Sequence, residues 1–279
     1  MITRDQLKTE LELGNSARTI GEKYGYPTKT IYGYISRYKL KSRRFKYTID
    51  TEKLLSVSDP VTNYLAGLIA TDGYLVKGHE RVDIVLVGDS EKELLAKIVD
   101  YYNSDIPVNT YRAPNNKEKH QIGITADGFK AFLVNNFGLV TDNKTLNVTT
   151  PQTFSDEDCA RMYVRGCFDG DGSFTISTSK LSILTKSEQF ITGLRDIIEE
   201  YTGYRVTVSL TRGYPALYYQ HSAAVEIQRW MYTSNEGMWL GRKFEKFKSV
   251  ISATSAPHDT SRGVLLGDGY QVTDRNTRG

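Results

Sequence analysis

The sequence contains few residues that bind transition metals or form disulfides, with 2 cysteines and 4 histidines among 279 residues. Cys159 and Cys167 are too few for a disulfide framework and, eight residues apart on one predicted helix, would not pair easily. The histidines are scattered without metal-ligand spacing, so each is interpreted as a surface or structural residue. This composition favours a reducing, intracellular setting.

Long apolar runs are missing as well. The longest extends from Tyr64 to Ala70, far shorter than the roughly 20 residues that cross a bilayer. The N-terminus lacks the apolar core of a secretion signal, so we expect no membrane partner. With 39% apolar and 25% charged residues, the composition is that of a soluble globular protein, and the length allows one large or two to three small domains.

Charge is unevenly distributed, although the net charge is only +3. Residues 1–50 carry 11 Lys and Arg against 5 Asp and Glu, whereas the remaining residues carry 25 against 28. A basic excess at one end is typical of an appendage that binds nucleic acid. A solvated charged surface is the alternative interpretation.

Two stretches about a hundred residues apart share an ending in Asp-Gly. The first reads Leu65-Ala66-Gly67-Leu68-Ile69-Ala70-Thr71-Asp72-Gly73, and the second reads Val164-Arg165-Gly166-Cys167-Phe168-Asp169-Gly170-Asp171-Gly172. One of them alone could be a buried amphipathic helix that happens to end in Asp-Gly. Two of them, each followed by similar sequence, argue against chance.

These stretches resemble the motif of the LAGLIDADG homing endonuclease family, in its single-chain form with two motifs. The first matches seven of the nine letters and the second four, and both keep the final acid and glycine. In that family the eighth-letter acid is a metal ligand, which implies this role for Asp72 and Asp171. Ala70 replaces the usual sixth-letter acid, whereas Asp169 keeps it, so we expect the two halves to be unequal.

The same site follows from physical reasoning about two paired helices. Gly67 and Gly166 would each cost roughly 1 kcal/mol inside a helix relative to alanine, which indicates that a second backbone approaches there. Such packing brings Asp72 and Asp171 together at the helix C-termini, where the helix dipoles and mutual repulsion disfavour carboxylates. A divalent cation would relieve both effects. Oxygen ligands without nearby Cys or His favour Mg²⁺ over zinc.

The resemblance implies further residues of the catalytic site. Each half of such an enzyme brings a basic residue near its phosphate, and Lys144 and Lys243 are predicted for this role; a surface lysine is the alternative for either. Gly73 and Gly172 are assigned to the metal site beside the aspartates, and they suit the left-handed residue that often follows a helix. The implied reaction is hydrolysis of one phosphodiester bond on each DNA strand, with the metal activating water.

Residues 3–40 are predicted to form three short helices, the second capped by Ser16 and the third opened by Pro27-Thr28. A tight turn at Gly25 between these two gives the helix-turn-helix pattern, and residues 16–32 are similar to that family. The first residues of a recognition helix lie nearest the base edges. The predicted DNA contacts are Lys29, Thr30, Tyr32 and Arg37 on the third helix, and Lys41, Arg43 and Arg44 in the connector, which can follow phosphates. A three-helix bundle used only for packing is the alternative.

The rest of the chain repeats one order of elements: motif helix, two strands, helix, two strands, helix. Ser90 and Ser187 each cap the helix that follows the first hairpin of a half, and this internal duplication predicts pseudo-twofold symmetry about the motif helices. We therefore predict an α+β chain with a helix-turn-helix domain at 1–45, a basic linker at 46–60, two αββαββα halves at 61–150 and 151–251, and a tail at 252–279 whose composition predicts disorder.

Each predicted half has four strands with helices on one face, which leaves the other face free. In the strand expected at 205–211, Val206, Val208 and Leu210 alternate with polar residues, as in the strand expected at 173–177. A solvent-exposed antiparallel sheet would look the same. The resemblance implies instead a saddle of two sheets over the major groove, which β-ribbons fit. The predicted contacts are Arg81, Lys119, Gln121, Ser173, Thr175, Ser177, Arg205, Thr207 and Ser209.

The resemblance implies a site-specific endonuclease, monomeric, that binds a long duplex DNA target in the major groove and makes a Mg²⁺-dependent double-strand break. A non-cleaving DNA-binding regulator on the same scaffold is one alternative, against which the retention of Asp72 and Asp171 argues. An intron maturase that binds RNA is another. A helix-turn-helix favours duplex DNA, because A-form RNA hides its major groove.

Overall fold

The computed structural model describes residues 2–12, 15, 17–40, 47–114, 117–233 and 237–254, the side chains of residues 12 and 250–254 excepted. The chain forms two compact units, Met1–Thr48 and Ile49–Gly279. The predicted cap at Ser16, the predicted contacts Lys41, Arg43 and Arg44, and the tail beyond residue 254 lie outside the described residues.

The first unit contains the three predicted helices, α1 (Arg4–Glu12), α2 (Ala17–Tyr24) and α3 (Thr28–Arg37). The turn between α2 and α3 passes through Gly25 at φ +73°, a left-handed conformation that favours glycine. A Cβ on Gly21 would lie only 2.5 Å from the Tyr26 carbonyl oxygen, so α2 packs directly against this turn. The apolar core of the unit is formed by Ile2, Leu7, Leu11, Ala17, Ile20, Ile31 and Ile35.

The second unit begins with a one-turn helix, α4 (Thr51–Leu54), followed by the first half. The carboxylate of Asp59 accepts a hydrogen bond of 2.8 Å from Thr62 N, and Pro60 occupies the first helical turn of α5, which explains where this helix starts. The elements of this half are α5 (Pro60–Asp72), β1 (Gly73–Leu75), β2 (Arg81–Val87), α6 (Asp89–Tyr101), β3 (Asn109–Arg112), β4 (Glu118–Thr125), α7 (Phe129–Phe137) and α8 (Lys144–Asn147).

The second half repeats this order. Its elements are α9 (Glu157–Asp171), β5 (Gly172–Thr175), the 3-10 helix η1 (Ile176–Thr178), β6 (Lys180–Leu184), α10 (Glu188–Thr202), β7 (Ser209–Thr211), β8 (Tyr214–Gln220), α11 (His221–Met231) and α12 (Gly241–Thr254). Ser187 caps α10 as predicted, because its Oγ accepts a 3.2 Å hydrogen bond from Phe190 N. The cap of α9 is Asp156, whose carboxylate accepts from Cys159 N at 2.8 Å.

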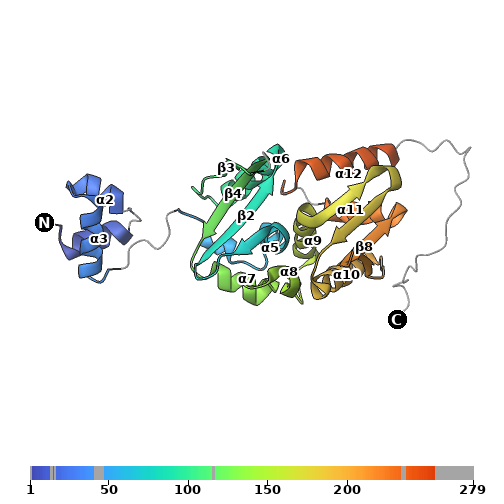
Figure 1. The fold of residues 1–279 in the computed structure, drawn as a ribbon, viewed down its shortest axis with the longest axis horizontal. Helices are drawn as coiled ribbons and strands as arrows, with labels where there is room; N and C mark the ends of the chain where they lie inside the picture. The colour runs from blue at the N-terminus through green and yellow to red at the C-terminus, as the bar shows by residue number, and fades with distance from the viewer. Residues whose placement is uncertain are drawn as a thin grey trace, which may run out of the picture. The chain divides into compact units, whose positions relative to one another are not determined.

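Each half contains one antiparallel four-stranded sheet, with the strand orders β1-β2-β4-β3 and β5-β6-β8-β7. The registers correspond, since Gly73 pairs with Ile84 in the first sheet and Gly172 pairs with Ile183 in the second. In Figure 1, α5 and α9 lie side by side between the two sheets. The predicted α+β class with two antiparallel sheets is therefore confirmed. Among the described helices, none combines the length and apolar composition needed to cross a bilayer.

The first strand of the second sheet is shorter than predicted. The strand expected at 173–177 ends at Thr175, and Ser177 lies in η1 instead. The chain turns there through Ser179 at φ +43°, a left-handed residue that is incompatible with an extended strand. Ser177 therefore lies beyond the end of the strand that it was expected to share with Ser173 and Thr175.

The third strand of the second sheet is also shorter. The strand expected at 205–211 is reduced to β7, so Arg205 and Thr207 precede it. Leu210, expected on a buried face, is 77% exposed. Leu210 lies on β7, the outermost strand of the sheet, and pairs with Pro215 of the neighbouring strand β8. At this edge an alternating pattern does not ensure that a helix covers the apolar side. The apolar residues of this alternating segment therefore do not all belong to the buried core.

Candidate functional site

The two motif helices, α5 and α9, contact each other through their glycines. A Cβ on Gly67 would overlap the carbonyl oxygen of Tyr163 and lie 3.0 Å from Cys167 N. A Cβ on Gly166 would overlap the carbonyl oxygen of Tyr64 in the same way. The backbones therefore touch at reciprocal positions, which confirms the close approach predicted from these glycines.

This contact brings two carboxylates together, because Asp72 and Asp171 are the last residues of α5 and α9. The Asp72 carboxylate reaches across to the neighbouring helix, where a Cβ on Gly170 would lie 3.1 Å from Asp72 Oδ2. Asp72 is half-buried and Asp171 is exposed. One carboxylate is thus partly enclosed by the protein, while the other faces the solvent side of the site.

Both carboxylates hold their protons more strongly than an ordinary aspartate. Partial burial, together with the charge of Asp171, raises the pKa of Asp72 to about 6, although Lys243 and Lys144 act in the opposite direction. Desolvation also raises the pKa of Asp171. A carboxylate pair of this kind lacks full charge compensation, which a cation would supply.

A lysine caps the C-terminal end of α5. Lys144 Nζ donates hydrogen bonds to the carbonyl oxygens of Ile69 at 3.0 Å and Thr71 at 2.7 Å, and to that of Gly73. A cation at this end satisfies unpaired carbonyls and is stabilised by the helix dipole. Burial lowers the pKa of Lys144 to about 8.

A second lysine does the same for α9. Lys243 Nζ donates to the carbonyl oxygens of Phe168 at 2.5 Å, Asp169 at 2.6 Å and Gly170 at 3.2 Å. This lysine is buried, and burial lowers its pKa to about 8. The two lysines predicted from the sequence therefore both lie at the helix ends, with their ammonium groups bonded to backbone carbonyls.

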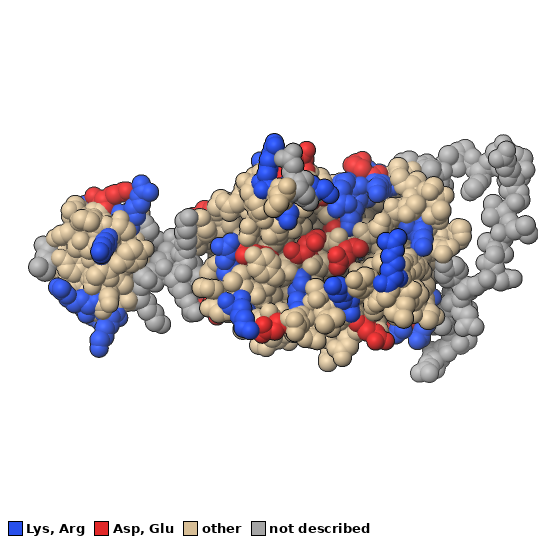
Figure 2. Space-filling model, viewed as in Figure 1, with Lys and Arg blue, Asp and Glu red and all other residues tan. Residues whose placement is uncertain are grey.

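The surroundings of the carboxylates are mainly basic. Figure 2 shows acidic side chains gathered at the centre of one face of the second unit, with Lys and Arg around them. A cavity of about 310 Å³ opens beside Asp171 and Lys144 and is also lined by Lys186 and Tyr214. The Lys186 ammonium lies 5.5 Å from the centre of the Tyr214 ring. Neither residue was predicted as part of the site. The apolar alternation of β6 ends before Lys186, so the strand pattern gave no indication of where the Lys186 side chain lies.

Asp169, the sixth motif letter, is fully buried and serves the framework of the site. Its carboxylate accepts hydrogen bonds from Tyr64 Oη of α5 at 2.8 Å, from Leu240 N at 2.9 Å and from Tyr232 Oη at 3.4 Å. Burial raises its pKa. Ala70 stands at the matching position of α5 and has no carboxylate. These hydrogen bonds therefore have no counterpart in the first half, in keeping with the expected inequality of the halves.

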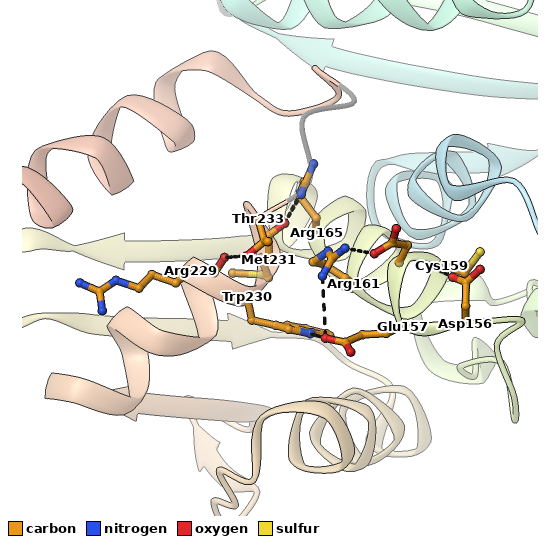
Figure 3. Close-up of polar contacts among 10 residues, drawn as sticks. Asp156, Glu157, Cys159, Arg161, Arg165, Arg229, Trp230, Met231 and Thr233 are labelled. Atoms are coloured by element: carbon orange, nitrogen blue, oxygen red, sulfur yellow. Dashed lines mark hydrogen bonds and ion pairs between the residues drawn. The ribbon is translucent and has the colours of Figure 1, made fainter.

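Arg165 extends this framework from α9 to α11. It is fully buried, and its Nε donates to the Met231 carbonyl oxygen at 2.5 Å while Nη1 donates to that of Met238 at 3.3 Å. Figure 3 shows Arg165 directed at the end of α11, with Trp230 Nε1 donating to Glu157 at 2.9 Å near the start of α9. The start and the middle of α9 are thus fixed by polar contacts. The sequence signal for this role was an arginine at the second letter of the second motif, where the first motif has Ala66.

Gly73 and Gly172 follow the two aspartates, but their conformation differs from the expectation. Their φ angles are −96° and −78°, which are extended rather than left-handed, because the chain runs from each helix straight into a strand. Glycine is required there by close approach: a Cβ on Gly73 would lie 2.7 Å from Ile69 Cα, and one on Gly172 would overlap the Phe168 ring. The Gly73 carbonyl is also bonded by Lys144.

The open face of the first sheet carries three of the predicted DNA contacts. Lys119 and Gln121 are half-buried there and alternate with buried residues of β4. Arg81 Nε donates to Asp83 at 2.6 Å, and the Asp83 side chain is largely buried. Its carboxylate therefore offsets the charge that Arg81 presents on this face.

The open face of the second sheet carries Ser173, Thr175 and Ser209, all exposed. Lys180 lies across from Thr175 in the strand pairing, and its ammonium is 3.8 Å from the centre of the Tyr218 ring. This cation–aromatic pair was not predicted, although both residues alternate with buried ones on β6 and β8. Three predicted contacts lie off the strands, namely Ser177, Arg205 and Thr207.

In the first unit, α3 presents Lys29, Tyr32 and Arg37 to solvent, with Tyr32 58% exposed, whereas Thr30 is half-buried. The Arg37 guanidinium lies 5.9 Å from the centre of the Tyr34 ring. The buried residues of α3 are Ile31 and Ile35, one turn apart. The helix is therefore amphipathic, with its polar side available for a partner.

Residues 158–222 match the family model of a LAGLIDADG-like domain. This segment covers most of α9, the second motif, the second sheet and α10. No curated protein matches the chain.

Solved structures give distant likenesses. Full-length DUF199/WhiA from Thermatoga maritima is 16% identical, with 76% of this chain and 69% of that chain covered and a TM-score of 0.48. The homing endonuclease I-WcaI bound to its DNA recognition sequence is 12% identical, with 69% and 87% covered and a TM-score of 0.49. I-DmoI in complex with DNA and Mn is 16% identical, with 64% and 99% covered and a TM-score of 0.45.

Proposed function

We propose that this protein is a metal-dependent endonuclease of the LAGLIDADG type that cuts both strands of a specific duplex DNA site. The observation that carries the proposal is the reciprocal glycine contact of α5 and α9, which sets Asp72 and Asp171 side by side at the helix ends. The family match of residues 158–222 supports it for the second half. The seven matching letters of the first motif support it for the first half.

The residues of the site fit a hard divalent cation. Asp72 and Asp171 offer carboxylate oxygens, which are the ligands that Mg²⁺ prefers. Their raised pKa values show that the two negative charges are incompletely compensated by the protein, and a bound cation would stabilise them. When bound, the cation would supply an activated water and stabilise the negative charge that develops on the phosphate. Gly73 and Gly172 belong to this site in the proposal, as the backbone that holds each carboxylate at its helix end.

The other basic residues of the site have separate tasks in the proposal. Lys144 and Lys243 hold the two helix ends in place and add positive charge behind the carboxylates, which favours an approaching phosphate. Lys186, on the cavity beside Asp171, contacts the DNA backbone. Lysine serves this purpose as a point charge that binds phosphate without reading sequence.

Sequence preference would come from the open faces of the two sheets, because polar side chains on β-strands can reach base edges in the major groove. The proposed base contacts are Lys119, Gln121, Ser173, Thr175 and Ser209. The proposed backbone contacts are Arg81, Ser177, Arg205 and Thr207, which are ion-paired or lie off the strands. The first unit adds a helix-turn-helix contact through Lys29, Thr30, Tyr32 and Arg37, and the connector adds Lys41, Arg43 and Arg44.

The proposal is tested by incubating the protein with a plasmid library of genomic fragments and Mg²⁺, then mapping any new ends. We expect breaks at one or a few sites, abolished by chelator and by the Asp72→Asn, Asp171→Asn double substitution. A protein that selects specific fragments from the same library without breaking them, in any divalent cation, is the non-cleaving regulator. Selective binding of RNA over duplex DNA would instead identify the maturase.

A further inference from the structure

Away from the motif helices, three potential metal ligands of the first half meet at one end of its sheet. Asp89 is the first residue of α6, and Glu118 and His120 lie two residues apart on β4. One ligand atom of each lies within 4.8 Å of the other two. Because residues two apart on a strand share a face, Glu118 points to the same side of the sheet as the buried residues His120, Ile122 and Ile124, the side that the helices cover.

His120 distinguishes this group from a cluster of surface acids. Its side chain is 1% exposed, and its Nδ1 lies 2.9 Å from Thr110 Oγ1. Its Nε2 is buried and, within the described part of the chain, has no hydrogen-bond partner. Buried polar atoms are almost always paired, so an unpaired nitrogen on a histidine that lies beside two carboxylates indicates a missing ligand.

The Thr110 hydroxyl can select the tautomer of the imidazole. When Nδ1–H donates to the Thr110 hydroxyl, Nε2 carries the lone pair, which is the form that binds a metal. Thr110 lies directly opposite His120 in the pairing of β3 with β4, so the sheet itself fixes this contact. A hydroxyl or carbonyl that orients the second nitrogen is the usual outer partner of a metal-bound histidine.

The group is particular to the first half and is not a by-product of the repeated fold. The two sheets have corresponding registers, which put Pro215 at the position of His120 and Gly213 at the position of Glu118. Neither replacement offers a side-chain ligand. The duplicated framework therefore tolerates the loss of these residues, and their presence in the first half calls for a local reason.

We propose that Asp89, Glu118 and His120 bind one Zn²⁺ ion, with water in the fourth position. One nitrogen and two carboxylate ligands suit zinc, whereas Mg²⁺ and Ca²⁺ prefer oxygen alone. Ligand atoms of one zinc each lie about 2.0–2.2 Å from it, so the three must draw closer together. The exposed side chains of Asp89 and Glu118 can rotate toward the fixed imidazole. The ion would join the start of α6 to β4 and stabilise the first half.

The test uses full-length protein carrying Asp72→Asn and Asp171→Asn, so that the other carboxylate pair cannot take up zinc. After treatment with chelator and its removal, calorimetric titration with ZnCl₂ should give one ion per chain. Asp89→Asn and Glu118→Gln, both at exposed positions, should each weaken zinc binding at least about tenfold, since even partners behind the ligands contribute that much. Glu93→Gln, an exposed acid on the same helix α6, is the matched control and should bind zinc unchanged.

A second readout separates zinc binding from damage to the fold. At one fixed zinc concentration, zinc should raise the thermal unfolding midpoints of the parent protein and of Glu93→Gln equally. It should raise those of Asp89→Asn and Glu118→Gln by clearly less, because weaker binding stabilises less, while their metal-free midpoints should match that of the parent. Absence of zinc binding by the parent overturns the proposal. Unchanged zinc affinity in either ligand variant overturns it as well.

Discussion

At the scale of single residues, Asp72 stands where a carboxylate is poorly tolerated: at a helix C-terminus, partly out of water and beside Asp171. Lys144 and Lys243 compensate in part, because each places an ammonium group on the carbonyls of one helix end. The same residues are those that the proposed reaction needs. The Asp72 carboxylate therefore lowers the stability of the metal-free fold while serving the proposed reaction, and its effect on the free energy of unfolding can be measured.

We predict that the metal-free protein loses stability as pH rises from about 4 to 6. The folded-state pKa of Asp72 is about 6 against an ordinary value of 3.8, so in this window the folded chain keeps a proton that the unfolded chain has released. The free energy of unfolding then falls with rising pH. Denaturant unfolding in chelator, repeated across this range, should show a shallower fall for Asp72→Asn than for wild type or for Glu93→Gln. Identical slopes in all three proteins would refute the assignment.

We also predict that Lys243→Met destabilises the protein by about 2–4 kcal/mol, because it removes charge-assisted hydrogen bonds and leaves buried carbonyls unpaired. Lys144→Met should cost less, since Lys144 is only half-buried whereas Lys243 is buried. Lys246→Met, at an exposed position of the same helix α12, should change stability by less than about 0.5 kcal/mol. Denaturant unfolding measures all three, and equal effects at Lys243 and Lys246 would contradict the capping role.

At the scale of elements, the packing of α5 on α9 decides where the site lies. Gly67 and Gly166 let the backbones touch, and no side chain larger than hydrogen fits at either position without a shift of the facing carbonyl. The sequence predicted this contact because glycine inside an apolar helix is costly unless it serves close packing. The tie of Asp169 to Tyr64 and Leu240 was not predictable, because it joins residues that only the folded chain brings together.

We predict that Gly67→Ala lowers the free energy of unfolding by about 1–3 kcal/mol, the usual cost of overpacking, even though alanine favours a helix. Gly33→Ala on α3 is the control for helix preference: its Cβ would meet nothing within 4 Å among the described residues, so it should stabilise the first unit by up to about 1 kcal/mol. Thermal unfolding reports both. A stabilising Gly67→Ala would mean that the two helices do not touch there.

At the scale of the whole molecule, the repeated order of elements was readable because hairpins and helices recur at matched positions in both halves. The predicted cap at Ser90 was wrong: α6 begins at Asp89, after Gly88, and Ser90 lies inside the helix, so only Ser187 caps its helix as predicted.

The alternation of apolar and polar residues did not predict where the strands end. The strand β7 has only three residues, and Leu210 is exposed at the edge of the sheet. Strand ends depend on the neighbouring strand and on covering helices, which a single-strand pattern does not contain. From the sequence His120 was interpreted as a surface or structural residue, since its proposed partner Asp89 lies 31 positions away and on another element.

We predict that removal of residues 1–48 weakens DNA binding and reduces its salt dependence, because much of the basic excess of the chain lies there. For every phosphate that the truncated protein no longer neutralises, the slope of log affinity against log salt should become shallower by about 0.9. Titration of a labelled target duplex at several salt concentrations measures both effects. An unchanged slope in the truncated protein would exclude the first unit as a DNA-binding module.

The central claim is that Asp72 and Asp171 form one cleavage site, and strand-resolved cleavage of a mapped target in Mg²⁺ tests it most directly. Loss of a ligand that stabilises the transition state by several kcal/mol should slow hydrolysis about a thousandfold or more. We predict that Asp72→Asn and Asp171→Asn each slow the cutting of both strands to this extent while specific binding of the target persists. Double-strand cleavage at the wild-type rate by the Asp72→Asn, Asp171→Asn double variant would contradict the account.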